Sequence, residues 1–279
     1  MVGIQYANLT VTLRIIVVGI NHYLPFQQFR RQARLAHQDN RRQMAVDADY
    51  YDGIQLTPEQ IAILEVVRRF VDEQIIPVAN ELEHADEYPT AIVEGMKELG
   101  IFGLMIPEEY GGMGLDFISE ALICEEIERG EAAFRTLISV HVGLNSLALL
   151  KYANEEQKQR WLVPQAKAEK LACFGLTEPD AGSNPGGMRS HAVDKGSHVV
   201  LNGSKTWITN SPHATVFVVW AKDEKGDIRG YVLERDKMEG ITTPKIEGKH
   251  SLRASTTGMI MMEDVKVPKE NILNVKGLK

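Results

Sequence analysis

The sequence has 279 residues, of which 44% are hydrophobic and 25% are charged, so it can form one large domain or two modest ones with buried cores. Its formal net charge of −7 argues against a general nucleic-acid-binding protein and against a protein that binds acidic membranes. The two cysteines, Cys124 and Cys173, provide neither a disulfide framework nor the spacing of a metal site, which favours a reducing, intracellular compartment.

Residues 1–43 differ in composition from the rest of the chain. They contain six arginines and one acidic residue, and their apolar piece VTLRIIVVGI is too short to span a bilayer and is interrupted by Arg14. An arginine-rich start is typical of a mitochondrial transit peptide, but this one has no serine. The alternative, which we favour, is an over-extended start with the initiator at Met44. In either case we expect residues 1–43 to lie outside the folded domains.

Residues 54–170 are predicted to form an all-α domain. In QLTPEQ, Thr57 is the expected N-cap, Pro58 takes the first helical position, and Gln60 closes a capping box. Apolar residues then recur at three- and four-residue steps until Pro77, which kinks or ends the helix.

Further helices are expected along the same domain. One covers Thr90–Leu99 and stops at Gly100, and two more lie near Phe117–Arg129 and Phe134–Tyr152. A last one begins in NEEQKQRWL, whose Asn and second Gln form another capping box.

Residues 171–279 are predicted to form an all-β domain. The pair Asn202-Gly203 between β-rich runs predicts one hairpin turn, and TVFVVWAK followed by KDEKGD and IRGYVLER predicts a second hairpin. TGMIMMEDVKVP reads as a final strand that ends at Pro268. Because the connections are short, the sheet is expected to be antiparallel. The fold class is therefore α+β.

Two stretches of the β-domain suggest a ligand. In FGLTEPDAGSNPGGM, Gly182 lets a ligand approach the backbone and Ser183 adds a hydroxyl beside free N–H groups, which suits an anion. In KTWITNSP, Trp207 and Thr209 lie two residues apart on a strand and face one side, which suits a flat heteroaromatic ring. Taken alone, the first stretch fits an ordinary polar loop better, and a Trp on a strand is more often a core residue.

Several common motifs are absent from the sequence. It contains no GxGxxG of a dinucleotide-binding βαβ unit and no GxxxxGK[ST] of a P-loop. It also lacks HExxH, CxxC and GxSxG. A ligand at these stretches is therefore not bound by a Rossmann turn.

Together, FGLTEPDAGS and TWITNS resemble the flavin-binding signature of the acyl-CoA dehydrogenase family. IPEEYGGMG, EEQKQRWL and RASTTGMIMMEDVKVP agree with the family in the same order, so the resemblance extends from residue 55 to about residue 275. It implies FAD as cofactor, a helical N-terminal domain and a barrel-like middle β-domain. The residues that the resemblance assigns to FAD are Phe174, Leu176, Thr177, Gly182, Ser183, Trp207, Ile208 and Thr209.

The resemblance also implies a role for each group of these residues. Phe174, Leu176 and Thr177 would line the flavin, with Thr177 meeting its pyrimidine edge. Gly182 and Ser183 would hold the pyrophosphate, and Ser183 would also lie near the CoA moiety. Trp207 would pack beside the isoalloxazine ring, with Thr209 hydrogen-bonded near flavin N5.

Within the family, the stretch EIERGEAAFRTLISVH most resembles glutaryl-CoA dehydrogenases. There the residue that matches Arg135 pairs with the distal carboxylate of the acyl chain, a role that suits a bidentate guanidinium. Glu128 and Thr136 match further acyl-pocket positions, although Thr136 stands where a Ser is expected. From the residues alone, an Arg that snorkels over Phe134 and its apolar neighbours is nearly as good an explanation. A generic short-chain acyl-CoA dehydrogenase also remains open.

The family's catalytic base is a Glu in a C-terminal helical bundle, which this sequence does not contain, so no catalytic residue is assigned. The chain is therefore expected to be a fragment that is inactive and binds FAD weakly by itself, and a non-catalytic flavin- or acyl-CoA-binding remnant is the alternative. The resemblance implies an acyl-CoA substrate, an electron-transfer flavoprotein as partner, and a homotetramer at full length. It also implies a cytoplasmic location in a bacterium or the mitochondrial matrix in a eukaryote, with no nucleic acid, metal or membrane span.

Overall fold

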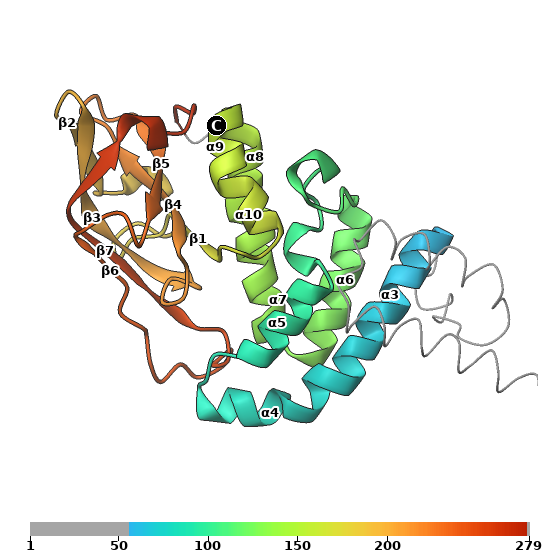
Figure 1. Cartoon of the computed structure of the whole chain (residues 1–279). Coiled ribbons are helices and arrows are strands. Elements are labelled where there is room, and N and C mark those ends of the chain that lie inside the picture. The colour runs from blue at the N-terminus through green and yellow to red at the C-terminus, as the bar shows by residue number, and fades with distance from the viewer. Residues whose placement is uncertain (1–55, 278–279) are drawn as a thin grey trace, which may run out of the picture.

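The structure, a computed structural model, describes residues 56–277, and the two parts of the predicted α+β fold follow each other along the chain (Figure 1). The expectations for residues 1–43 lie outside the described residues. The helices are α3 (Pro58–Phe70), α4 (Ile76–Ala85), α5 (Thr90–Glu98), α6 (Phe117–Gly130), α7 (Ala132–Ile138), α8 (Leu147–Tyr152), α9 (Glu155–Gln157) and α10 (Val163–Ala166). The strands are β1 (Ala172–Gly175), β2 (His191–Asp194), β3 (His198–Thr209), β4 (Val216–Lys222), β5 (Ile228–Glu234), β6 (Ile241–Thr242) and β7 (Thr257–Pro268).

Both predicted capping boxes are confirmed. Gln60 N–H donates to Thr57 Oγ1 at 3.2 Å, and Thr57 N–H donates to the Gln60 side chain at 2.9 Å. Asn154 and Gln157 make the same reciprocal pair at the start of α9. Each pair satisfies two backbone donors that a helix start leaves without intrahelical partners, so these residues set where the helices begin.

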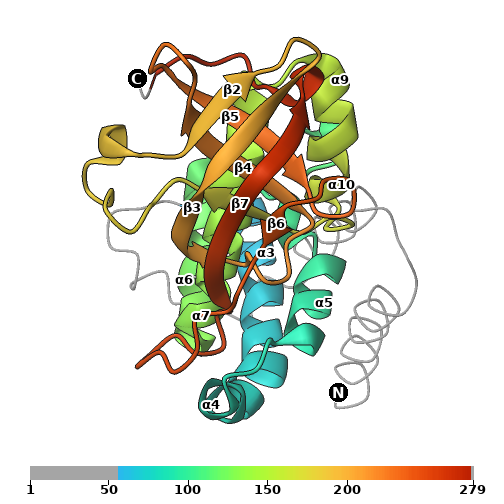
Figure 2. The same ribbon diagram turned by 90° about the vertical axis from the view of Figure 1, so that its left-hand side faces the viewer.

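The helix does not end at Pro77. A π-helical segment, Val71–Ile75, joins α3 to α4, and Ile76 N–H donates to Val71 O. The wider turn lets the chain stay helical although Pro77 lacks an N–H and its ring crowds the preceding turn. Both views show the axis bending between α3 and α4 (Figures 1 and 2). The kink that the sequence predicted is therefore present, and the helix continues to Ala85.

The strands form one sheet in the order β1-β4-β2-β3-β7-β6, with β5 also paired to β4, and the sheet curls as Figure 2 shows. The expectation of a purely antiparallel sheet was wrong at two pairings. β1 runs parallel to β4 from Ala172↔Val216 to Gly175↔Val219, and β2 makes one parallel pair with β4. The β2–β3 hairpin lies between β1 and β4 in the chain, which gives the long connection that parallel pairing needs.

The hairpin turn predicted at Asn202-Gly203 is also wrong. β3 runs through both residues, and its register against β7 shifts between Leu201 and Gly203. Gly203 has a φ of 143°, and a side chain there would collide with Ser190, so the glycine serves a close approach, opposite a bulge in β7. The second predicted hairpin, β4–β5, and the final strand to Pro268 are confirmed.

Apolar residues form one core among the helices, one inside the curled sheet, and a third between the sheet and α8–α10. The helical run Ala132–Tyr152 is long and apolar enough to cross a membrane by length and composition, but 56% of that window is buried inside the protein. Its later part packs against β1. Contact with these cores is a sufficient reason for its apolar composition.

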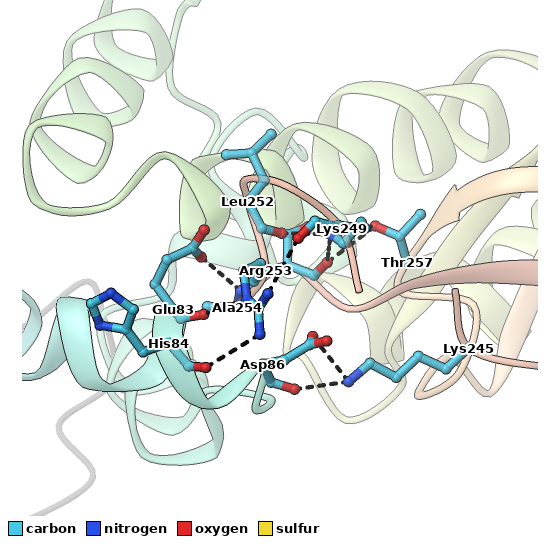
Figure 3. A network of polar contacts seen from close by, with 10 residues as sticks. Glu83, His84, Asp86, Lys245, Lys249, Leu252, Arg253, Ala254 and Thr257 are labelled. Atoms are coloured by element: carbon cyan, nitrogen blue, oxygen red, sulfur yellow. Dashed lines mark hydrogen bonds and ion pairs between the residues drawn. The ribbon is translucent and has the colours of Figure 1, made fainter. Parts of the chain in front are cut away.

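A strap of residues 243–256 connects the two halves (Figure 3). Arg253 donates to the carbonyl oxygens of Glu83 and His84 at the end of α4, at 3.0 and 3.3 Å. Lys245 Nζ donates to Asp86 O at 2.7 Å and lies 3.0 Å from Asp86 Oδ1. Ala254, next in the strap, is buried in the helical core. The strap therefore fixes how the β-domain sits on the helices.

Candidate functional site

The two motif stretches lie side by side. Phe174 lies in β1, and Leu176 and Thr177 follow the end of that strand. Thr206 N–H of β3 donates to Thr177 O at 2.9 Å. Lys205 Nζ donates to Leu176 O at 3.1 Å. Residues separated by about 30 positions in the sequence thus lie next to each other, as a common site requires.

The loop after Thr177 turns sharply and then becomes exposed. Glu178 and Ala181 exchange two backbone hydrogen bonds, each of 3.1 Å, and Gly182 and Ser183 follow on the surface. A Cβ at Gly182 would meet no atom within 4 Å, and the residue does not have a positive φ. Packing and backbone conformation therefore do not require glycine here, and the backbone at Gly182 is open to the approach of a ligand.

Trp207 is exposed and strained. Its side chain is 61% accessible, its φ is 59°, and the register of β3 against β7 shifts between Lys205 and Ile208. A positive φ is unusual for a bulky residue and costs energy, and such strain concentrates at functional sites. The bulge holds a large flat ring outside the sheet next to the Thr177 loop, which the sequence alone did not reveal.

The other residues assigned to FAD occupy less open positions. Phe174 and Leu176 are half-buried against the core between sheet and helices, and the Phe174 ring lies 5.9 Å from that of Trp220. Thr209 is half-buried, and Ile208 packs with its side chain inside the sheet core. A ligand contact of Ile208 is thus restricted to its backbone, and the assignment stays a prediction.

Sequence reasoning missed a buried ion pair beneath these stretches. Lys205 Nζ lies 2.7 Å from Glu178 Oε1, and their side chains are 0% and 5% accessible. The backbone N–H groups of Arg189 and Ser190 also donate to Glu178, at 2.6 and 3.0 Å. Burial would raise the pKa of Glu178, but the N–H groups and the ammonium hold that pKa below its ordinary value. The carboxylate of Glu178 is therefore already paired with a cation and hydrogen-bonded, and it is not free to act as a base.

The residues assigned to the acyl chain lie on the helices. Arg135 Nε of α7 donates to Glu128 Oε2 of α6 at 2.7 Å, and both side chains are about a third to a half accessible. Thr136 Oγ1 donates to Ala132 O at 3.0 Å, within its own helix. The structure thus brings Arg135 and Glu128 together as a partly exposed pair.

One helical run links the two sets of residues. It carries Arg135 and Thr136 near its start and the fully buried His141 further on. His141 Nδ1 accepts from Ala172 N–H of β1 at 3.2 Å, so Nε2 donates to Gln165 O at 3.0 Å. Burial lowers the pKa of His141 to about 4, although the bond to Gln165 opposes this. The neutral imidazole ring of His141 therefore links the helix to the sheet through hydrogen bonds.

Within the two motif stretches, the Trp207 ring, Gly182 and Ser183 lie on the surface. Among residues 56–277, no group of three or more His, Cys, Asp or Glu side chains is placed to hold a metal ion.

Comparison with known proteins agrees with this picture. The profile of the acyl-CoA dehydrogenase N-terminal domain matches residues 57–169, and that of the acyl-CoA dehydrogenase middle domain matches residues 173–265. A glutaryl-CoA dehydrogenase of Desulfococcus multivorans is 40% identical over 229 residues, covering 80% of this chain and 59% of the relative. A mitochondrial short-chain specific acyl-CoA dehydrogenase of Rattus norvegicus is 34% identical over 232 residues, covering 82% and 56%.

A solved structure is similar in fold as well. The glutaryl-CoA dehydrogenase of Mycobacterium smegmatis, in complex with FADH2, superposes with a TM-score of 0.76 at 37% identity, covering 80% of this chain and 57% of that one. The chain thus spans a little over half the length of the relatives that it matches. With both profiles matched in order over most of its length, the chain belongs to the acyl-CoA dehydrogenase family.

Proposed function

We propose that this chain supplies the FAD- and acyl-CoA-binding part of an acyl-CoA dehydrogenase. The observation that carries the proposal is the strained, exposed Trp207 next to a loop whose Gly182 faces open space. A relative of the same fold is described in complex with FADH2, which supports FAD as the cofactor. FAD supplies the hydride acceptor for α,β-dehydrogenation of a thioester.

The residues of this chain would bind and orient both partners. Trp207 packs against the flavin ring, and Thr177 and Thr209 offer hydroxyls to its edges. The backbone at Gly182 and the hydroxyl of Ser183 accommodate the pyrophosphate, close to where the CoA moiety lies. Because Glu178 already accepts from Lys205 and two backbone N–H groups, we assign it no proton transfer.

Flavin titrations test this proposal. We expect FAD to bind the full chain, detected by flavin fluorescence, and to bind more tightly than riboflavin, which lacks the pyrophosphate. Equal affinities would contradict the role of Gly182 and Ser183. Absence of FAD binding, even when the C-terminal part of a relative is supplied, would contradict the proposal as a whole.

For the substrate we propose glutaryl-CoA, oxidised and decarboxylated to crotonyl-CoA. The support is Arg135 at the acyl-pocket position, together with the 40% identity to a glutaryl-CoA dehydrogenase. One observation favours a generic short-chain acyl-CoA instead, since Glu128 already neutralises Arg135 at 2.7 Å. A glutaryl chain must therefore compete with Glu128 for the guanidinium, whereas a butyryl chain would leave the pair intact.

The remaining partners follow from the same proposal. Electrons would pass to an electron-transfer flavoprotein, and the full-length protein would form a homotetramer. We place the activity in a reducing compartment, the bacterial cytoplasm or the mitochondrial matrix, where the free thiols of Cys124 and Cys173 remain reduced.

A further inference from the structure

The buried pair Glu178–Lys205 connects three segments around the candidate flavin site. Lys205 Nζ donates to Glu178 Oε1 at 2.7 Å and to Leu176 O at 3.1 Å. Glu178 also accepts from Arg189 N–H and Ser190 N–H, where the exposed loop returns to the sheet. One ion pair thus joins the start of the loop, its end, and strand β3.

The surrounding residues make room for this pair. A Cβ at Gly175 would lie 3.3 Å from Lys205 Cγ and closer still to Ile260 and Val219, so the glycine lets the lysine stem pass beneath β1. Ser190 packs on Gly203, which lies opposite a bulge of β7, and Lys205 immediately precedes the bulge of β3 that carries Trp207. Two irregularities in the pairing of β3 with β7 therefore lie on either side of Lys205, next to the segments that its hydrogen bonds connect.

The pair is not explained by stability alone. Removing two charges from water is costly, and a buried ion pair often stabilises a fold no better than apolar residues of the same volume. A lysine and a glutamate that are almost fully inaccessible therefore need another reason to be there. Their hydrogen bonds go to Leu176 O and to the N–H groups of Arg189 and Ser190. These groups lie at the two ends of the loop that contains Thr177 and Ser183, which points to control of that loop's conformation.

We infer that Glu178 and Lys205 are positioning residues that hold the Thr177–Ser183 loop and the Trp207 bulge in register for the flavin. The inference rests on the proposed function, because it concerns the same FAD site. Neither side chain touches the cofactor: the pair sets the distance between the ring-binding and anion-binding ends. Its loss separates these ends without removing any residue that contacts FAD.

The test compares Glu178→Gln, Lys205→Met and the double variant in the full chain. Lys205→Met keeps the apolar stem beside Gly175 but leaves Glu178 buried without its cation, and the double variant removes both charges. We expect hydrogen exchange at the amides of Arg189 and Ser190 to accelerate at least about tenfold in Lys205→Met. We expect the affinity for FAD to fall by at least about tenfold in both single variants, with partial recovery in the double variant.

Glu126→Gln is the matched control. Glu126 is 5% accessible and pairs with Arg68 and Arg129 at 2.7 and 3.0 Å within the helices, far along the chain from the loop. Its loss should lower stability in urea but leave the exchange of the loop amides and the FAD affinity at wild-type values. The comparison separates a general loss of stability from a local loss of loop geometry.

Two outcomes would overturn the inference. One is a set of single variants that lose stability like Glu126→Gln but retain wild-type loop exchange. The other is faster loop exchange with unchanged FAD affinity, because the loop geometry would then not determine the site. A wild-type chain that does not bind FAD even when the C-terminal part of a relative is supplied contradicts the proposed function instead, so the two failures are distinguishable.

Discussion

At the scale of single residues, Gly182 gives a sharp test of ligand approach. Since a Cβ there would meet no atom within 4 Å, Gly182→Ala should leave the free energy of unfolding within about 0.5 kcal/mol of wild type. The added methyl group would stand where the pyrophosphate approaches, so the Kd for FAD should rise at least tenfold, a loss of about 1.4 kcal/mol. Urea unfolding and flavin fluorescence measure the two effects.

Gly186→Ala serves as the control in the same loop. A Cβ there would make one ordinary contact, 3.5 Å from Asn184 Oδ1, and the residue has no positive φ. It should change neither stability nor FAD affinity. If Gly182→Ala and Gly186→Ala weakened FAD binding equally, the loss of affinity would be an effect of any substitution in the loop. The argument for a ligand contact at Gly182 would then fail.

Arg135 tests the substrate assignment. In an enzyme completed with the C-terminal part of a relative, Arg135→Met would leave the distal carboxylate of glutaryl-CoA without its partner in the acyl pocket. Stranding one member of a buried charge pair costs about 3–5 kcal/mol, and about 1.4 kcal/mol is a factor of ten in kcat/KM. We expect kcat/KM for glutaryl-CoA to fall at least about a hundredfold.

Butyryl-CoA is the control substrate for the same variant. Its acyl chain has no distal carboxylate, so its turnover should hold or improve in Arg135→Met. The ion pair with Glu128 is itself partly exposed and contributes little to stability, so the fold should tolerate its loss. Parallel losses on both substrates would refute the glutaryl assignment and leave only the wider family.

Part of the site could be predicted from residue types and part could not. The motif resemblance predicted that Thr177 and Trp207 lie near each other. The hydrogen bond from Thr206 N–H to Thr177 O supports this prediction. The positive φ of Trp207 depends on a bulge whose position is set by pairing with β7, so no local pattern reveals it. The burial of Lys205 could have been predicted from the sequence. It lies four residues after Leu201 on the same strand, and this even spacing places both side chains on the buried face.

At the scale of elements, His141 joins a helix, β1 and the segment at Gln165, and this joint is sensitive to pH. The ring is inaccessible and neutral in the folded chain, where its pKa is lowered to about 4, against 6.5 as its ordinary value. Between these values the unfolded chain binds a proton that the folded chain excludes. The free energy of unfolding should therefore fall as the pH decreases from about 6.5 to about 4, by up to roughly 3 kcal/mol.

Urea unfolding at a series of pH values measures this slope. Glu178 and Glu234, whose pKa values lie below their ordinary value despite burial, lose their contribution only at lower pH, below about 4.5. His213, whose pKa is lowered by burial and by nearby Arg235 and Lys245, acts in the same direction as His141. His141→Gln should lower stability at neutral pH but flatten the slope above pH 4.5. An unchanged slope would refute the role of His141.

Element boundaries followed from the sequence where local chemistry decides them. The capping boxes at Thr57 and Asn154 and the stop at Gly100, with a φ of 71°, depend on neighbouring residues alone. The Asn202-Gly203 pair misled because a glycine with positive φ suits a close approach within a strand as well as a turn, and pairing with β7 decides between them. The parallel pairing of β1 with β4 likewise depends on distant residues.

At the scale of the whole molecule, the two halves are held together by polar contacts as well as apolar ones. The strap binds the carbonyl oxygens at the end of α4, and the ring of Tyr88 stacks on that of His213 with 3.9 Å between their centroids. The residues that we propose for the acyl chain lie in the helical half and those that we propose for the flavin lie in the β half, so in this proposal the docking sets the distance between substrate and cofactor. Sequence patterns predicted both halves but not their docking, because its contacts join residues far apart in the chain.

The final prediction concerns assembly. The chain spans a little over half the length of its relatives, and we propose that residues of their C-terminal part complete the FAD site. We therefore expect this chain alone to bind FAD weakly and to show no turnover of acyl-CoA. Co-expression with the C-terminal part of a relative should give a yellow, larger assembly that reduces an electron acceptor with an acyl-CoA. Absorbance at the flavin band, gel filtration and dye reduction measure these three changes. If the chain purifies by itself with stoichiometric FAD, the described residues suffice for the cofactor and the proposed need for a further part is wrong.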